Sequence, residues 1–218
     1  EGLDREVLRL AAPAGLTSVM ARDQLRQIDP AAVVDLVHYY GLNLTAGSRG
    51  KRLGSQRTPA PRQGSLTIGM IDTAVGRHPA LASARVISCP AGSLPTAPVE
   101  HGTAVASLLA GEGSTTIYSA NIFRGPANRP FTSADVIAQA LEWMIASKVA
   151  TVNMSLAGPR NAVLDRLIRD ALGRGHQVVA AAGNGGPTAP PAYPAAVPGV
   201  VAVTAVDRDM RIYRYANR

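Results

Sequence analysis

From residue 66 onwards, the chain alternates short apolar runs with longer segments of helical periodicity. The apolar runs cover residues 66–71, 117–123, 150–154, 178–182 and 200–205. Segments typical of helices lie between them, at about 101–112, 133–147 and 161–174. Strands that are apolar on both faces and alternate with helices indicate a parallel sheet covered on each side. The pattern therefore predicts an α/β fold with a doubly wound parallel sheet.

The first forty residues predict a smaller α+β unit. Residues 6–10 alternate like a half-buried strand, and Thr17 or Ser18 can cap a helix that ends near Asp29. Residues 33–39 read as a second strand. A β-α-β unit of this size is too small to be stable alone, so we expect it to lie against a neighbouring surface.

A segment without hydrophobic periodicity separates the two units. Residues 41–64 are rich in Gly, Ser, Pro and Arg, which is typical of an exposed linker. We therefore divide the chain into a first unit at 1–42, a linker at 43–64 and a main domain at 65–218.

Composition narrows the class of protein. With 46% hydrophobic residues the chain is typical of a globular protein, and it has no run of about 18 apolar residues that would span a membrane. Its one cysteine, Cys89, excludes an internal disulfide. The net charge of +7 comes largely from the linker, and aromatic residues are only 4% of the chain, so no platform for stacking bases is evident. We expect no nucleic-acid partner.

Polar side chains follow several of the predicted strands. Asp72 ends the first strand, residues 153–158 follow the third, and a Gly183-Asn184-Gly185-Gly186 loop follows the fourth. In parallel sheets, ligands collect at the carboxyl ends of the strands. Read alone, Asp72 is better explained as a loop cap and Asn184 as a turn residue than as functional groups.

His101 changes this interpretation. It stands in the first turn of a helix of small and apolar residues, where Val105, Leu108 and Leu109 predict the buried face and Gly102 allows close approach of another backbone. An aspartate, a histidine and an amide donor are the parts needed for acyl transfer, apart from the nucleophile.

Several segments resemble the motifs of the subtilisin-like serine proteases, the subtilases. The similar segments are Ile71-Asp72-Thr73-Ala74-Val75, Glu100-His101-Gly102-Thr103-Ala104, Asn153-Met154-Ser155-Leu156-Ala157-Gly158, Ala181-Ala182-Gly183-Asn184 and Tyr193-Pro194-Ala195. They occur in the family's order, and the resemblance runs from about residue 66 to residue 218.

The resemblance implies a set of roles. Asp72 would orient His101, His101 would act as the base, and Asn184 would donate to the oxyanion. A polypeptide substrate would bind as a strand between Ser155, Leu156, Ala157 and Gly158 on one side and Asn128, Arg129 and Pro130, up to Phe131, on the other. The Tyr193–Pro194 bond would be cis. We expect no cofactor and assign no metal site.

The chain departs from the family pattern in one important way. The serine motif, Gly-Thr-Ser followed by small residues and proline, does not occur in it, so we expect this chain to be inactive by itself. One explanation is an N-terminal fragment with a sheet incomplete at its C-terminus, whose serine lies on a further segment. The other is a catalytically dead pseudoprotease that binds peptides.

The resemblance also covers the first unit. Residues 1–42 resemble part of a ferredoxin-like subtilase prodomain, which would act as an inhibitor and chaperone with its end in the active cleft. The linker would then hold the self-processing site, and family analogy implies an exported protein, secreted or periplasmic.

A nucleotide-binding α/β domain is the competing class. The glycine loop at 183–186 follows a strand, but Pro187, Pro190 and Pro191 stand where a phosphate-binding helix would begin. The four histidines show no metal-ligand spacing with Cys89 or with carboxylates, so a zinc site is not expected either.

Overall fold

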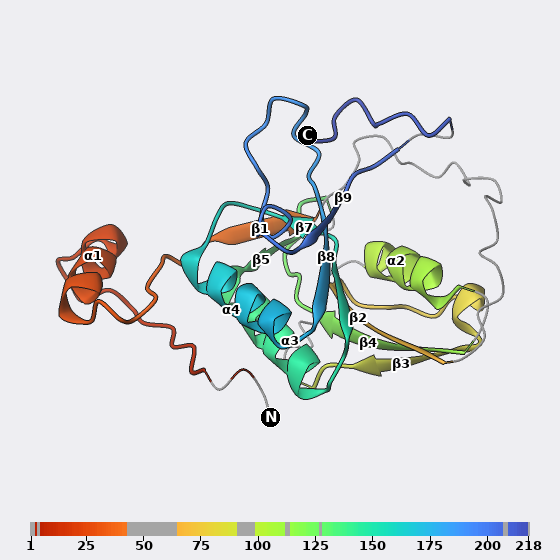
Figure 1. Cartoon of the computed structure of the whole chain (residues 1–218), viewed down its shortest axis with the longest axis horizontal. Helices are drawn as coiled ribbons and strands as arrows, with labels where there is room; N and C mark the ends of the chain where they lie inside the picture. Colours follow the sequence, from red (N-terminus) through yellow and green to blue (C-terminus); the bar gives the residue numbers. More distant parts are fainter. Residues whose placement is uncertain are drawn as a thin grey trace.

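The main part of the molecule is a parallel sheet, as the sequence predicts, and among the described residues this sheet has six strands, one more than the five predicted. A computed structural model of the chain describes residues 3, 5–42, 65–90, 99–111, 114–126, 128–206 and 209–217. The strands are β2 (Leu66–Asp72), β3 (Ala84–Ser88), β4 (Thr115–Asn121), β6 (Thr151–Met154), β8 (Gln177–Ala181) and β9 (Val201–Val203), in the order β3-β4-β2-β6-β8-β9 (Figure 1). All neighbouring strands in this sheet are parallel.

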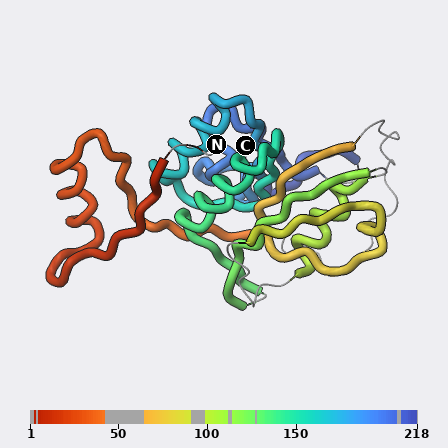
Figure 2. Tube along the Cα trace, turned by 90° about the horizontal axis from the view of Figure 1, so that it is seen from below, coloured from red at the N-terminus to blue at the C-terminus, as the bar shows by residue number. Residues whose placement is uncertain are grey.

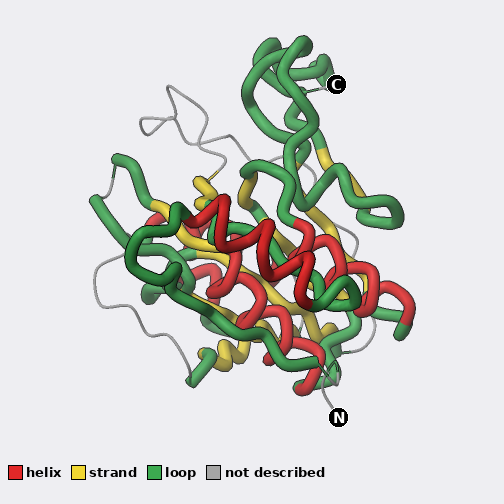
Figure 3. Tube along the Cα trace, turned by 90° about the vertical axis from the view of Figure 1, so that its left-hand side faces the viewer, coloured by secondary structure: helices red, strands yellow, loops and turns green. Residues whose placement is uncertain are grey.

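Helices cover both faces of the sheet. The helix α2 (Glu100–Ala110) lies on one face, and α3 (Ala134–Ala146) and α4 (Ala162–Gly173) lie together on the other (Figure 1). The central strand β2 shows why: Met70 clusters with the residues of α2, and the adjacent Ile71 belongs to the core formed with α3 and α4. Both side chains are 0% exposed, so consecutive residues of β2 face two different cores. In Figure 3 helices cover the strands on the side that faces the viewer.

The predicted buried face of α2 is wrong for Leu108, whereas Val105 and Leu109 are half-buried and pack against the core cluster of Met70, Ala106, Ala110 and Ile117. Leu108 is 82% exposed, whereas the buried residues are Gly102, Ala106 and Ala110. The small residues face inward because the start of α2 packs directly on backbone, and a Cβ at Gly102 would lie 2.6 Å from the carbonyl oxygen of Ala74. Close approach thus determines which side of the helix is buried.

The first unit is less regular than the predicted β-α-β pattern. Its helix α1 (Ser18–Ile28) is confirmed, with the Thr17 hydroxyl accepting from the Met20 amide and Asp29 at the C-cap. The helix has no buried residue and stands away from the rest of the molecule in Figures 1 and 2. The strand predicted at 6–10 is wrong, and of the strand predicted at 33–39 only Tyr39 belongs to a strand.

Contacts with α3 and α4 explain the extended N-terminal segment. The Leu3 amide donates to the Glu142 carboxylate at 2.8 Å, and two arginines of the segment form ion pairs with the same helices. These pairs are Arg5–Asp170 at 2.6 Å and Arg9–Asp135 at 3.1 Å. Side-chain contacts with the main domain therefore replace the strand pairing expected within the first unit.

A second, three-stranded sheet joins the two units. Strand β1 (Tyr39–Leu42) lies between β5 (Phe131–Ser133) and β7 (Leu156–Ala157) and is antiparallel to both. The sequence analysis did not predict β3, β5, β7 or the short 3-10 helix η1 (Pro79–Leu81). The linker predicted at 43–64 lies outside the described residues.

Candidate active site

Asp72 and His101 form a hydrogen-bonded pair at the carboxyl end of β2. Asp72 is the last residue of β2 and is fully buried, and His101 lies in the first turn of α2. His101 Nδ1 lies 2.7 Å from Asp72 Oδ1, which also accepts from the Thr73 amide at 2.6 Å. With Nδ1–H donating to the carboxylate, Nε2 keeps its lone pair. The His101 side chain is 20% exposed, so this arrangement can supply a base.

Two threonines bond the end of β2 to the start of α2. The Thr73 hydroxyl accepts from the Gly102 amide at 2.7 Å, and the Thr103 hydroxyl accepts from the Gly76 amide at 2.7 Å. Both bonds flank the Asp72–His101 pair in sequence, so they restrict the movement of one partner relative to the other. The sequence analysis quoted both threonines within motifs but gave neither a role.

Asn184 lies at the same edge of the sheet as Asp72. It follows β8, which is separated from β2 only by β6. At the end of β6, the Asn153 side-chain amide donates to the Ser155 hydroxyl at 3.0 Å. The polar residues expected at the carboxyl ends of three strands are therefore together at one edge, and Asn184 is half-buried there.

The proposed peptide-binding strands are occupied by the chain's own β1. Gly41 pairs with Phe131 of β5 and with Ala157 of β7, and Leu42 pairs with Leu156. The segment predicted on one side, from Ser155 to Gly158, thus contains the strand that pairs with β1.

The segment predicted on the other side, from Asn128 to Phe131, overlaps the strand that pairs with β1 only at Phe131. Phe131, Thr132 and Ser133 pair with β1, whereas Asn128, Arg129 and Pro130 precede the pairing strand. Arg129 belongs to a turn, since its amide donates to the Pro126 carbonyl at 2.9 Å, and contact of these three residues with a substrate stays a prediction. Phe131 exchanges two backbone hydrogen bonds of 2.9 Å with Arg124, which closes that turn.

Tyr40 is the most deeply buried residue of β1, at 2% exposed. Its hydroxyl donates to the Pro159 carbonyl at 2.8 Å, and its ring lies on Gly158, where an added Cβ would be 2.8 Å from the ring atoms Cε1 and Cγ. Burial raises the pKa of the Tyr40 phenol, with smaller contributions from the carboxylates of Asp165 and Asp35. No feature of the sequence pointed to Tyr40.

The other histidines make structural contacts. His78 is the N-cap of η1 and accepts from the Ala80 amide at 3.2 Å, and His176 Nδ1 lies 2.8 Å from the Val149 carbonyl oxygen. His38 Nδ1 lies 3.1 Å from the Asn161 side-chain nitrogen. Among the residues that the structure describes, no three His, Cys, Asp or Glu side chains gather to hold a metal ion.

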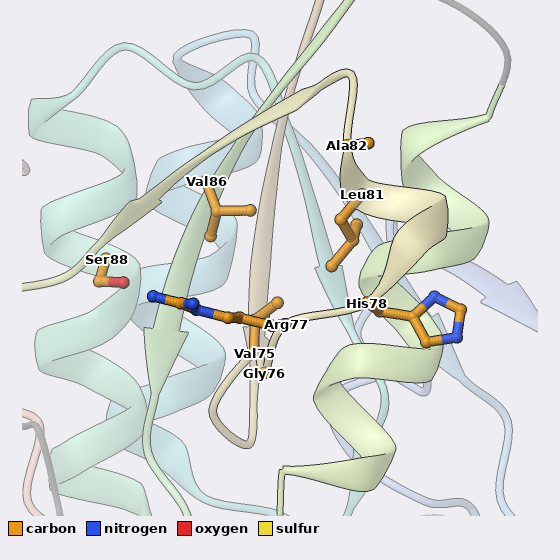
Figure 4. Close-up of a pocket in the computed structure, with 8 residues that line it drawn as sticks. All are labelled: Val75, Gly76, Arg77, His78, Leu81, Ala82, Val86 and Ser88. Carbon is orange, nitrogen blue, oxygen red and sulfur yellow. The ribbon is translucent and has the colours of Figure 1, made fainter.

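A shallow pocket of about 360 Å³ lies between η1 and β3, outside the Asp72–His101 pair. Its polar side chains are Arg77, His78 and Ser88. In Figure 4 the Arg77 guanidinium extends toward Ser88, whereas the His78 ring lies on the opposite side, near α2. These groups do not converge on one point, so we do not include the pocket in the candidate site.

No helix within the described ranges has the length and apolarity needed to cross a membrane.

Comparison with known proteins agrees with this architecture. The model of the family described as "Subtilase family" matches residues 63–218. Subtilisin BL of Lederbergia lenta is 29% identical over 170 residues, covering 70% of this chain and 62% of its own length. The chain therefore spans less than two thirds of this relative.

Solved structures show the same fold. The psychrophilic subtilisin-like protease Apa1 from Pseudoalteromonas sp. AS-11 superimposes with a TM-score of 0.59 at 22% identity, covering 70% of this chain and 38% of its own. The prenylagaramide maturation protease PagA superimposes with a TM-score of 0.57 at 23% identity, covering 70% and 58%. With a family model matching most of the main domain and a subtilisin-like α/β fold, this chain belongs to the subtilase family.

Proposed function

We propose that the full-length protein is a serine endopeptidase that hydrolyses polypeptides through an Asp-His-Ser triad. The observation that carries this proposal is the 2.7 Å contact between buried Asp72 and His101 at the carboxyl end of β2. Family membership supports the same reaction, because the matching relatives include subtilisins and an alkaline protease. The serine is proposed to lie outside these 218 residues, because no serine here stands in the family's motif.

The proposed reaction gives Asp72, His101, Asn184 and the serine one role each, and His101 acts in both halves of the reaction. Asp72 accepts a hydrogen bond from the Nδ1–H group of His101 and stays ionised, and Nε2 takes the proton of the serine hydroxyl as the serine oxygen attacks the peptide carbonyl. Asn184 donates to the oxyanion that forms. His101 then returns the proton to the leaving amine as the C–N bond breaks, and water hydrolyses the resulting ester by the same route.

The position of β1 supports a peptide as the ligand of this site. An extended segment adds a third strand between β5 and β7, with backbone pairing on both sides and Tyr40 buried beside Gly158. We propose that substrates bind in the same place and that residues 1–42 act as an inhibitory prodomain. We place the processing site between residues 43 and 64, and we propose export by analogy with the family.

Hydrolysis of a fluorogenic peptide by the full-length protein tests the proposal. We expect activity in the wild type, a loss of at least about 1,000-fold in kcat for His101→Ala, and little change for His78→Ala, a control that removes a histidine from the N-cap of η1. Equal activity of the wild type and His101→Ala would exclude the triad.

A peptide-binding pseudoprotease is the second candidate. The docking of β1 favours it as much as it favours an enzyme, because strand addition needs no nucleophile. Full-length protein that binds peptides at this site but hydrolyses none would support this candidate.

A further inference from the structure

The loop that carries Asn184 contains three glycines, at positions 183, 185 and 186, which leave its backbone easy to deform. Gly183 and Gly186 have φ values of +108° and +101°, a region that favours glycine, and they bracket Asn184. A donor that stabilises an oxyanion must already point at the reacting atom, because reorganisation during the reaction costs free energy. Something outside the loop must therefore hold it.

The C-terminal part of the chain supplies these contacts. The backbone amide of Asn217 donates to the Gly183 carbonyl at 3.1 Å, and the side-chain oxygen Oδ1 of Asn217 accepts from the Gly185 backbone amide at 2.8 Å. Asn217 thus bonds to the residue before Asn184 and to the residue after it. Its Nδ2 donates to the Pro190 carbonyl at 3.2 Å, so both ends of the side-chain amide are used.

Packing reinforces this arrangement. Asn217 is 9% exposed, and a Cβ at Gly183 would lie 2.8 Å from Asn217 Nδ2. The Gly186 amide also donates to the Tyr215 carbonyl at 2.8 Å, so the same C-terminal segment contacts the far side of the loop. Gly183, whose φ is positive, therefore lies directly against the buried side-chain amide of Asn217.

We propose that Asn217 is a positioning residue that holds the Asn184 loop in the conformation needed for oxyanion stabilisation. The inference rests on the proposed function, because it assigns Asn184 to the oxyanion. We assign Asn217 no contact with substrate: its side chain acts through its hydrogen bonds to Gly185 and Pro190, while its backbone amide bonds to Gly183. The position requires a short side chain that accepts a hydrogen bond from the Gly185 amide and donates one to the Pro190 carbonyl, as asparagine does.

The test is a double-mutant cycle in the processed full-length enzyme. We expect Asn184→Ala to lower kcat about 100- to 1,000-fold. Asn217→Ala should lower kcat about 10- to 100-fold, with KM changed less than about threefold, because a misplaced donor weakens transition-state binding. In the Asn184→Ala background, Asn217→Ala should have less than about a threefold effect.

Thr115→Val is the matched control. It removes the buried 2.8 Å hydrogen bond from the Thr115 hydroxyl to the Ala110 carbonyl, at the amino end of β4 and the opposite edge of the sheet. Its effect on unfolding should resemble that of Asn217→Ala, but kcat should not change. If the double variant lowers kcat by the product of the two single-variant effects, Asn217 and Asn184 act independently and the proposal is overturned.

Hydrogen exchange separates the failure of this inference from the failure of the proposed function. In the 218-residue chain, Asn217→Ala should speed exchange of the Gly185 and Gly186 amides at least about tenfold, whereas Thr115→Val should not. Unchanged exchange at both amides overturns the inference even if the enzyme is active. A wild type that hydrolyses no peptide overturns the proposed function and, with it, the role of Asn217 in catalysis, while the exchange result still reports whether Asn217 holds the loop.

Discussion

Replacement of Gly158 by alanine should release β1 from the site between β5 and β7. The new Cβ would lie 2.8 Å from Cε1 and Cγ of the Tyr40 ring, whereas nonbonded carbon atoms prefer about 3.5–4.0 Å. Gly158 cannot retreat easily, because its amide and carbonyl each form a 3.0 Å hydrogen bond with Tyr193. The Tyr40 ring must therefore move.

The size of the effect follows from what Tyr40 would lose. Overpacking alone costs about 1–3 kcal/mol. Complete expulsion of the ring would expose about 150–250 Å² of aromatic surface, at about 25 cal/mol per Å², and would break the hydrogen bond to Pro159. We therefore expect docking of β1 to weaken by about 2–5 kcal/mol, which is roughly a 30- to 4,000-fold change in its equilibrium constant.

Hydrogen exchange of residues 39–42 in the 218-residue chain measures this change, with limited proteolysis as a second readout. Gly173→Ala is the control: Gly173 is the last residue of α4, and an added Cβ there meets nothing within 4 Å. It should leave β1 protected. Equal protection of β1 in Gly158→Ala and the wild type would refute the view that Tyr40 is held by close packing on Gly158.

Two further predictions concern Tyr40, and a third concerns the Asp72–His101 pair. Tyr40→Phe removes the 2.8 Å bond to Pro159 and should destabilise β1 docking by about 1 kcal/mol, seen as about fivefold faster exchange at residues 39–42. Burial raises the pKa of the Tyr40 phenol, so its contribution to the free energy of unfolding is fully present below the pKa of a free tyrosine, about 10, and is lost as pH rises further. The difference in unfolding free energy between the wild type and Tyr40→Phe should therefore shrink above about pH 10. A difference that stays constant across this range would contradict the prediction. Asp72→Asn should lower kcat of the full-length enzyme about 10,000-fold with KM nearly unchanged, because an amide no longer holds the required tautomer of His101.

The parallel sheet and the meeting of Asp72 and Asn184 at one edge of it were predictable from the sequence for a physical reason. Strands buried on both faces need continuous apolar runs, and β2 has them, with Met70 and Ile71 facing opposite cores. Since the carboxyl ends of parallel strands meet at one edge, the polar residues after β2 and β8 had to lie at that edge. The pairing of Asp72 with His101 followed from the motifs rather than from periodicity.

The docking of β1 and the role of Asn217 could not be predicted in this way. The Tyr40–Pro159 hydrogen bond joins residues 119 positions apart, and β5 and β7 have three and two residues, too few to show periodicity. Leu108 misled the analysis of α2 because an apolar residue was expected to be buried, whereas backbone contact at Gly102 determined the orientation of the helix. These features depend on tertiary contacts with no local pattern.

The central claim is that Asp72 and His101 activate a serine, and fluorophosphonate labelling of the full-length protein tests it most directly. We predict that mass spectrometry finds a single labelled serine outside these 218 residues, and that His101→Ala slows its labelling by at least about 1,000-fold. The absence of any labelled serine, or labelling at the same rate in His101→Ala, would contradict the account.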